Sequence, residues 1–246
     1  MAERDKNGVA LVIGAGDATG GAVARRFAAE GYTVAMTRRA RNLDRLEALA
    51  EDIRGIGGEA VAFGVDARDE DDTVGLFEEI ERDLGPIKVC VYNVGGNVRF
   101  PIRDTTARVY RKVWEMCAFG AFLAGREAAR VMVPRGEGTI LFTGATAGLR
   151  GGSGYAAFAS GKFAMRALAE SMARELMPQN IHVAHVVIDA AIDTAFIRDN
   201  FPERYRPEED LVVDPNAIAE TYWQIHTQPR SAWTFETQLR PWGETW

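Results

Sequence analysis

The 246-residue sequence contains few of the residues that cross-link a chain or bind metals. It has only two cysteines and three histidines. Cys90 and Cys117 both lie in apolar segments, without the spacing of metal ligands and without the further cysteines of a disulfide framework. The sequence therefore gives no sign of a metal site or a disulfide scaffold, and we expect both thiols to be reduced and buried.

Long apolar runs and clusters of basic residues are also missing. No segment has the length needed to span a membrane, and the first eight residues, MAERDKNG, are charged where a secretory signal would be apolar. The net charge is −6 and the basic residues are scattered, which argues against a nucleic-acid-binding surface. We therefore expect a soluble, cytoplasmic protein that acts on small molecules, with neither nucleic acid nor membrane as a partner.

A glycine-rich turn near the N-terminus is the strongest local signal. Residues 9–37 read as an apolar run, a turn of small residues, a helical pattern and a second apolar run, which is the size of a βαβ unit. The turn contains Gly14, Gly16, Ala18 and Gly20, which allow backbone N–H groups and the helix N-terminus to approach a pyrophosphate. The pattern favours a nucleotide site, and a glycine-rich connection without a ligand is the alternative.

The rest of the chain alternates in the same way between apolar runs and helical patterns. Further strands are predicted at residues 60–65, 87–92, 140–143, 181–187 and 233–239. This alternation predicts one α/β domain over residues 1–246, a doubly wound, Rossmann-type parallel sheet of about seven strands with helices on both faces. Ligands bind such sheets at the carboxyl ends of the strands, where the glycine turn lies.

Two predicted helices, at residues 106–132 and 156–176, are apolar on nearly every side. A helix of this kind is covered on both sides, and one sheet covers only one, so we expect these helices to form the interface of a homodimer or homotetramer. Residues 188–213 are expected to form a substrate loop whose polar part, 193–210, is mobile. The tail, 231–246, carries Trp242 and Trp246, which we expect to be packed against other groups.

These motifs resemble those of the short-chain dehydrogenase/reductase family over almost the full length of the chain. Ile13, Gly14, Ala18 and Gly20 occupy the places of the family's Thr-Gly-x-x-x-Gly-x-Gly turn, and Asn93-Val94-Gly95 resembles the end of its Asn-Asn-Ala-Gly motif. The resemblance implies hydride transfer between a nicotinamide cofactor and a carbonyl or alcohol. It also implies a set of cofactor-binding residues, namely Gly14, Gly16, Asp17, Ala18, Thr19, Gly20, Thr37, Arg38, Arg39, Asp66, Ala67, Asn93, Val94, Gly95, Lys162, Ile192 and Thr194.

The end of the second strand bears on the choice between NADP and NAD. NAD enzymes carry an acid there, whereas this chain has Thr37 followed by Arg38 and Arg39. Because the planar guanidinium suits a 2′-phosphate, NADP(H) is favoured, with NAD(H) as the alternative. Asp17 points the other way, since many NADP-dependent members place a basic residue at that position.

The resemblance fails at three of the four catalytic positions. The family uses a Tyr, a Lys four residues later, a Ser thirteen residues before the Tyr, and an Asn on the preceding long helix. Lys162 matches, but the other three positions hold Phe158, Ala145 and Cys117. Phenylalanine and alanine have no O–H group, so the usual proton route is absent.

Several other residues are candidates for the missing proton donor. They are Tyr155, Asp189 and Cys117, with the hydroxyl groups of Thr143 and Thr146 nearby. Asp189 stands where the family has the Pro of a Pro-Gly pair, and the buried or capping roles of all these residues are the plainer alternatives. Candidate substrate contacts are Arg99, Trp114 and Arg150.

Three hypotheses of function follow from this altered site. The leading one is an oxidoreductase that transfers hydride between NADP(H), or NAD(H), and a small apolar carbonyl or alcohol with an atypical proton donor. The second is a nucleotide-binding sensor without redox turnover. The third is a non-redox lyase or hydratase in the same pocket.

Overall fold

A single parallel sheet organises the protein. The computed structural model describes residues 7–200, 202, 205 and 211–243. Its main sheet has seven strands in the order β3-β2-β1-β4-β5-β6-β9, and every neighbouring pair is parallel. The predicted doubly wound sheet is confirmed. The strands are β1 Val9–Ile13, β2 Thr33–Arg38, β3 Glu59–Gly64, β4 Ile87–Tyr92, β5 Gly138–Ala145, β6 Ile181–Ile188 and β9 Glu236–Leu239.

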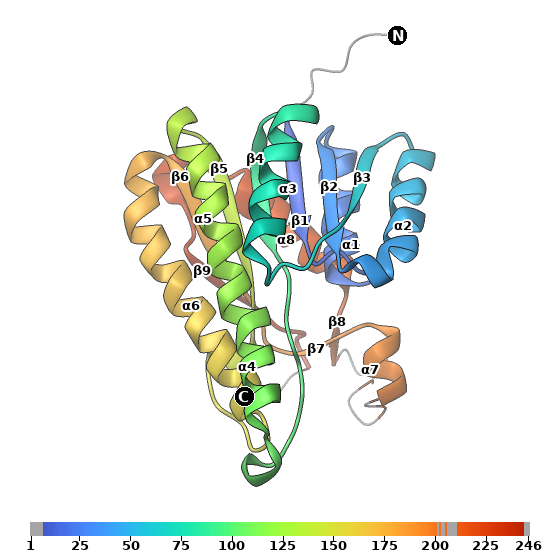
Figure 1. The fold of residues 1–246 in the computed structure, drawn as a ribbon, viewed down its shortest axis with the longest axis vertical. Helices are drawn as coiled ribbons and strands as arrows, with labels where there is room; N and C mark the ends of the chain where they lie inside the picture. The colour runs from blue at the N-terminus through green and yellow to red at the C-terminus, as the bar shows by residue number, and fades with distance from the viewer. Residues whose placement is uncertain (1–6, 201, 203–204, 206–210, 244–246) are drawn as a thin grey trace.

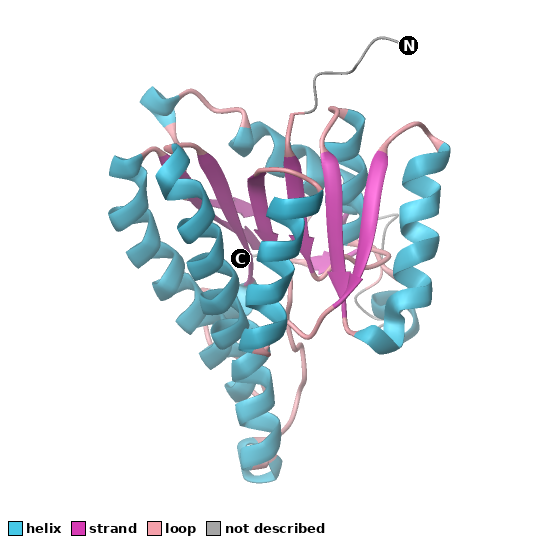
Figure 2. Cartoon of the chain, turned by 45° about the horizontal axis from the view of Figure 1, so that its top comes forward, coloured by secondary structure: helices cyan, strands magenta, loops and turns pink. Residues whose placement is uncertain are grey.

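Helices cover both faces of this sheet, as Figures 1 and 2 show. One apolar core lies between the sheet and α1 (Thr19–Ala29), α2 (Leu43–Gly55) and α8 (Pro215–His226). A second core lies between the other face and α3 (Glu70–Asp83), α5 (Gly120–Met132) and α6 (Ala156–Leu176). In the part of the chain that the structure describes, no helix is long and apolar enough to cross a bilayer.

The long helix expected over residues 106–132 is interrupted, which corrects the sequence prediction. It consists of α4 (Ala107–Trp114), a π-helical turn (Glu115–Phe119) and α5, and α4 projects beyond the sheet (Figure 1). A π-helical turn changes the intrahelical hydrogen-bond pattern. The Tyr92 hydroxyl donates to the backbone oxygen of Met116 within this turn, at 2.6 Å. Cys117 lies in the same turn, and periodicity alone does not reveal such an insertion.

The segment expected to be a mobile loop contains regular structure. β7 (Ala191–Ile192) pairs with β8 (Val212–Val213), and α7 covers Ala195–Asn200. The Thr194 hydroxyl accepts a hydrogen bond from the Ile197 N–H group at 3.1 Å, which caps this short helix. A helix of six residues spans less than two turns and is too short to show a helical period. Residues 201, 203–204 and 206–210 of the expected loop lie outside the described residues.

The two helices expected to meet another subunit carry exposed aromatic side chains. Tyr110, Trp114, Phe122 and Phe163 are each about two-fifths exposed in the single chain. The sequence pattern predicts that a second subunit covers this outer side of the helices. Trp242 is 84% exposed. Trp246 lies outside the described residues. The oligomer remains a prediction.

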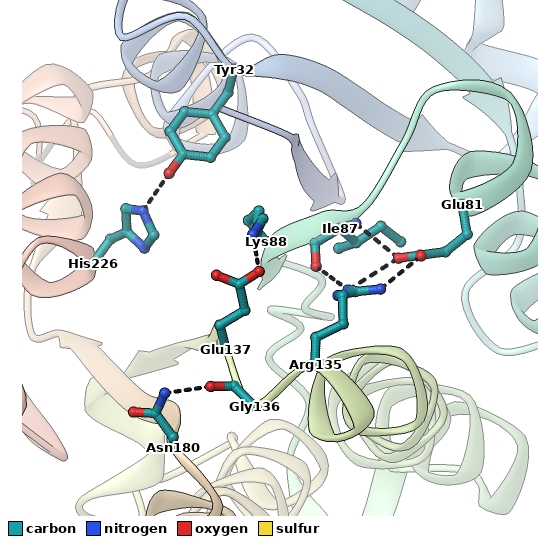
Figure 3. Close-up of polar contacts among 9 residues, drawn as sticks. All are labelled: Tyr32, Glu81, Ile87, Lys88, Arg135, Gly136, Glu137, Asn180 and His226. Atoms are coloured by element: carbon teal, nitrogen blue, oxygen red, sulfur yellow. Dashed lines mark hydrogen bonds and ion pairs between the residues drawn. The ribbon is translucent and has the colours of Figure 1, made fainter. Parts of the chain in front are cut away.

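Polar contacts secure the edge of the sheet where the strands begin (Figure 3). Arg135 donates to Glu81 and to the backbone oxygen of Ile87, both at 2.8 Å, and so ties the end of α5 to β4. Nearby, His226 at the end of α8 lies between the Tyr32 hydroxyl, 2.7 Å from Nε2, and the Thr139 hydroxyl, 2.9 Å from Nδ1. One imidazole thereby joins α8 to residues of β5 and the start of β2.

The imidazole of His226 makes stability depend on pH. Burial, with a smaller effect of His182, lowers the pKa of His226 from 6.5 to about 4, so the folded chain binds fewer protons than the unfolded chain between these values. The contribution of His226 to the free energy of unfolding should therefore be complete above pH 6.5. As the pH drops from 6.5 toward 4, the free energy of unfolding should fall by up to about 3 kcal/mol. Urea unfolding of the wild type and of His226→Gln over this range measures it. Identical pH dependence in both proteins would contradict the assignment.

Candidate active site

The glycine-rich turn after β1 is held at the carboxyl edge of the sheet by neighbouring strands. Gly14 has a φ of +90°, a left-handed conformation that glycine adopts without strain. The N–H groups of Gly14 and Ala15 both donate to the backbone oxygen of Thr37 at 3.1 Å. The side-chain amide of Asn93, just after β4, donates to the backbone oxygen of Gly14, also at 3.1 Å. The turn is thus fixed from both sides.

Close approach of the turn to α1 requires Gly20. A Cβ atom built on Gly20 would lie 2.5 Å from the Gly14 oxygen and 2.7 Å from the Ala15 Cα atom. The N-cap residue of α1 is Ala18, whose side chain cannot cap the helix, and the first turn contains no acidic residue. The hydroxyl group of Thr19 is buried without a hydrogen-bond partner in the described chain. This helix end can therefore bind an anion.

Arginine lies beside this turn. The Arg38 guanidinium is 3.6 Å from the position that a Cβ atom on Gly16 would take, and Arg38 Nη1 lies 3.7 Å from Asp17 Oδ1. The Asp17 side chain is 75% exposed, so this pair is weakly held. Arg38 is therefore placed to reach a charged group on a nucleotide bound at the turn.

Asp66, which the family resemblance assigns to the adenine, already has a partner. Arg68 donates through Nε to Asp66 Oδ1 at 2.9 Å and through Nη2 to Oδ2 at 2.5 Å. These hydrogen bonds hold the pKa of Asp66 below its ordinary value, so the carboxylate is charged. The neighbouring Ala67 oxygen lies against Gly120 of α5, where a Cβ atom would be 2.6 Å away. The sequence analysis did not name Arg68. The available signal was its position, since it is a cation only two residues after Asp66.

Lys162 of α6 reaches the ends of β4 and β5. Its Nζ atom donates to the backbone oxygen of Thr143 at 2.8 Å and to that of Val94 at 3.4 Å. The side chain is buried, and burial lowers the pKa of its ammonium group. A Cβ atom on Gly95 would lie 3.6 Å from Nζ, in ordinary van der Waals contact, so Gly95 borders the lysine directly. Lys162, Val94 and Gly95 therefore meet at one point of the edge.

Beside Lys162 the chain is apolar at the positions where the family has hydroxyl and amide groups. Phe158 is 8% exposed and Cys117 is fully buried, and they form one cluster with partly buried Ala145. Cys117 faces α6, because a Cβ atom on Gly161 would lie 2.8 Å from the Cys117 Cβ. None of these three side chains provides an oxygen for proton transfer.

The candidate proton donors are in different surroundings. The Thr143 hydroxyl hydrogen-bonds the buried hydroxyl of Tyr222 in α8 at 2.6 Å, a contact that sequence analysis missed. Tyr155 is the N-cap residue of α6 and packs on the apolar cluster that contains Ala145 and Phe158. The Arg99 guanidinium lies over the Tyr155 ring, 5.9 Å from its centroid.

Asp189, just after β6, is buried in ion pairs. Arg150 donates to its two oxygens at 3.2 and 3.1 Å, and Arg240 donates to Oδ2. Burial alone would raise the pKa of Asp189, but hydrogen bonds from Thr146, Arg150 and Arg240 hold it below its ordinary value. The Asp189 carboxylate is therefore charged at neutral pH and accepts rather than gives protons. Sequence analysis did not foresee Arg240, because no local pattern links it to a residue 51 positions earlier.

The remaining predicted cofactor residues lie in the segment after β6. Ile192 belongs to β7 and pairs with Val213, and the Thr194 hydroxyl is the cap of α7 described above. In the described ranges, no group of three acidic, histidine or cysteine side chains is arranged to hold a metal ion.

The steric requirement at Gly20 can be tested against a matched glycine. Gly20→Ala should lower the free energy of unfolding by about 2 kcal/mol, because a Cβ atom collides with the backbone of the turn. Gly75→Ala, in α3, has nothing within 4 Å and should instead raise it by about 0.5 to 1 kcal/mol. Urea unfolding of both variants measures the difference. Equal effects of the two substitutions would contradict this geometry.

Comparisons with known proteins agree with this geometry. A crystal structure of a short-chain dehydrogenase from Rhodopseudomonas palustris is 48% identical, covers 96% of this chain and 100% of its own, and superposes with a TM-score of 0.83. The 3-oxoacyl-(acyl-carrier-protein) reductase of Bos taurus is 31% identical over 78% of each chain. A metagenomic short-chain oxidoreductase in complex with NADP shares the fold, with 23% identity, a TM-score of 0.81, and coverage of 96% of this chain and 97% of its own. The sequence pattern of the short chain dehydrogenases matches residues 8–204, and the chain belongs to this oxidoreductase family.

Proposed function

We propose that the protein is an oxidoreductase that uses NADP(H) and acts on a small apolar carbonyl compound or alcohol. The observation that carries this proposal is the convergence of two features at the carboxyl edge of the sheet. One is the uncapped N-terminus of α1 behind the glycine turn, and the other is buried Lys162 between the ends of β4 and β5. They suit the two ends of a dinucleotide.

The residues at this edge fit such a cofactor. The N–H groups at the start of α1 would bind the pyrophosphate, and the unpartnered hydroxyl of Thr19 is available there. Lys162, which donates to the backbone oxygens of Val94 and Thr143, would hold the nicotinamide ribose. When bound, the cofactor supplies the hydride, and the protein's part is to position the reacting carbon beside it.

Arg38 supports a preference for NADP(H) over NAD(H). Its guanidinium lies against the glycine turn, and a planar fork of N–H donors suits a 2′-phosphate. The weak, exposed pairing with Asp17 leaves this guanidinium able to exchange partners. The NADP complex of the metagenomic relative is consistent with this assignment.

Tyr155 is our choice among the candidate proton donors. Cys117 is fully buried against α6, Thr143 is bonded to Tyr222, and Asp189 is held charged by its arginine partners. Tyr155, in contrast, lies on the apolar cluster of the site and is only partly buried. A positioned proton donor raises the rate of such a reaction by about 10²- to 10⁴-fold.

The surroundings of the site support two further parts of the proposal. The apolar walls at Ala145 and Phe158 favour an apolar substrate over a polyol, since they offer no hydrogen bonds. The exposed aromatic side chains of α4, α5 and α6 favour burial between copies of the chain, as a homodimer or homotetramer. A cytoplasmic location is part of the same proposal.

A second candidate function is nucleotide binding without redox turnover. The loss of oxygen-bearing side chains at Ala145 and Phe158 favours it specifically, because the usual acid and its partner are absent. A non-redox lyase or hydratase in the same pocket is the third. The three functions differ in one readout, which is the loss of reduced-cofactor absorbance when substrate is added.

Calorimetric titration with NADPH and NADH tests cofactor binding and its preference. Replacing both Arg38 and Arg39 with alanine should weaken NADPH by about 10- to 100-fold through lost charge-assisted hydrogen bonds, and NADH by less than about 3-fold. Arg45→Ala, an exposed arginine on α2, serves as the control and should change neither affinity. Equal losses for both cofactors would overturn the NADP assignment.

An absorbance screen of NADPH with aldehydes, ketones and activated alkenes then tests turnover. Substrate-dependent loss of the NADPH signal establishes the oxidoreductase. Binding of NADPH without any such loss would favour the sensor, and chemistry on the substrate without it would favour the lyase.

Restoring the family's hydroxyl groups tests the alignment of the site. Phe158→Tyr combined with Ala145→Ser should raise carbonyl reduction by about 10²-fold or more, because Lys162 is already in place. Initial rates of NADPH oxidation over a panel of ketones and aldehydes measure the gain. Phe163→Tyr, on the exposed side of α6, is the matched control and should give no gain. Unchanged rates in the double variant would show that these positions do not face the substrate.

A further inference from the structure

Two arginine side chains lie at the border of the apolar cluster beside Lys162. This cluster contains Phe158 and Cys117, with Ala145, Ala147 and Tyr155 packed against it. Arg99 lies over the ring of Tyr155, and the loop from residue 150 to residue 155 joins Tyr155 to Arg150. The Phe100 N–H group donates to the Gly154 oxygen at 2.9 Å, which fixes the Arg99 segment on that loop.

The Arg150 guanidinium is set in place beside the catalytic positions. Ile188 pairs with Ala145 across β6 and β5, so Asp189 follows directly on the strand beside Ala145. Asp189 is 2% exposed and holds both terminal nitrogens of Arg150, whose own side chain is 53% exposed. The backbone N–H group of Arg150 also donates to the backbone oxygen of Thr146 at 3.1 Å. A half-exposed cation is therefore fixed by a buried carboxylate.

Asp189 is shared with a second arginine, because its carboxylate also receives Arg240, whose side chain is 11% exposed. Arg99 lies over the Tyr155 ring and makes no ion pair with any residue in the described ranges. A cation without a carboxylate partner among these residues therefore lies against the same loop that carries Arg150.

Arg150 keeps donors for a further partner. A guanidinium has about five N–H donors in a planar fork, and Asp189 engages only the ends at Nη1 and Nη2. The donors that remain, on the half-exposed part of the group, match a second carboxylate. Because Asp189 already fixes the side chain, binding costs little further side-chain entropy.

We propose that the substrate is an apolar molecule with a carboxylate group, which Arg150 binds with help from Arg99 while the apolar part lies against the apolar cluster. The inference deepens the proposed function and rests on it for the reaction. The side chains of the apolar cluster give a polar group no partner, so the charged end of such a molecule lies at the arginines. Arg150 is then a residue that determines substrate specificity, and Asp189 is its positioning residue.

Matched pairs of ketones test this proposal by binding alone. The probes are 4-oxo-4-phenylbutanoate and 3-oxodecanoate, each compared with its methyl ester, titrated calorimetrically into the NADP⁺-saturated protein. The wild type should bind each carboxylate at least 10-fold more tightly than its ester. Arg150→Gln should remove most of that preference without changing the affinity for the esters, Arg150→Lys should restore part of it, and Arg99→Gln should reduce it less.

Arg174→Gln, at the far end of α6 and 77% exposed, is the control and should keep the full preference. A circular-dichroism spectrum of Arg150→Gln that matches the wild type at the assay temperature shows that the fold is retained, and Arg240 still pairs with Asp189 in this variant. The proposal is overturned if the wild type shows no preference for the carboxylates, if none of the four probes binds, or if Arg150→Gln keeps the preference. Tight carboxylate binding without NADPH oxidation would reject the oxidoreductase and leave the anion site standing, so the two failures are distinguishable.

Discussion

The hydrogen bond from the Asn93 side chain to the Gly14 oxygen connects the two halves of the site. It ties the glycine turn after β1 to the end of β4, and a Cβ atom on Gly20 would come within 3.0 Å of the same amide. On one side of this contact lies the uncapped start of α1, which offers its N–H groups. On the other side, Val94 accepts from Lys162. A small shift here would move the start of α1 relative to the lysine.

Charged side chains are unevenly distributed along this edge of the sheet. Around the nucleotide site, carboxylates such as Asp66 have arginine partners and stay ionised. In the apolar cluster beside Lys162, the positions of the family's acid, its hydroxyl partner and its amide are apolar. This edge therefore has an uncapped helix start and a buried lysine that suit a cofactor, and it lacks oxygen-bearing side chains at the positions of the family's proton donor. Under the proposed function, redox activity depends on Tyr155 and substrate specificity depends on Arg150 and Arg99.

Much of this architecture was predictable because it has a local signature. Alternating apolar runs and helical patterns gave the strands, the order of layers and the helix α6, and glycine spacing located the turn after β1. The π-helical turn was missed, because the Tyr92 hydroxyl that donates to its backbone comes from a distant strand. Asp189 was visible as a departure from the family, but its partners were not, since Arg150 and Arg240 reach it only through the packing of β5, β6 and β9. Ion pairs between distant segments leave no period in a sequence.

The central claim is that one dinucleotide joins the start of α1 to Lys162. A crystal structure of the protein soaked with NADPH tests this most directly. We expect the pyrophosphate on the N–H groups of the glycine turn, the 2′-phosphate within hydrogen-bonding distance of Arg38, and the nicotinamide ribose within hydrogen-bonding distance of Lys162 Nζ. Density for NADPH elsewhere on the protein, or a pyrophosphate away from the turn, would contradict the account.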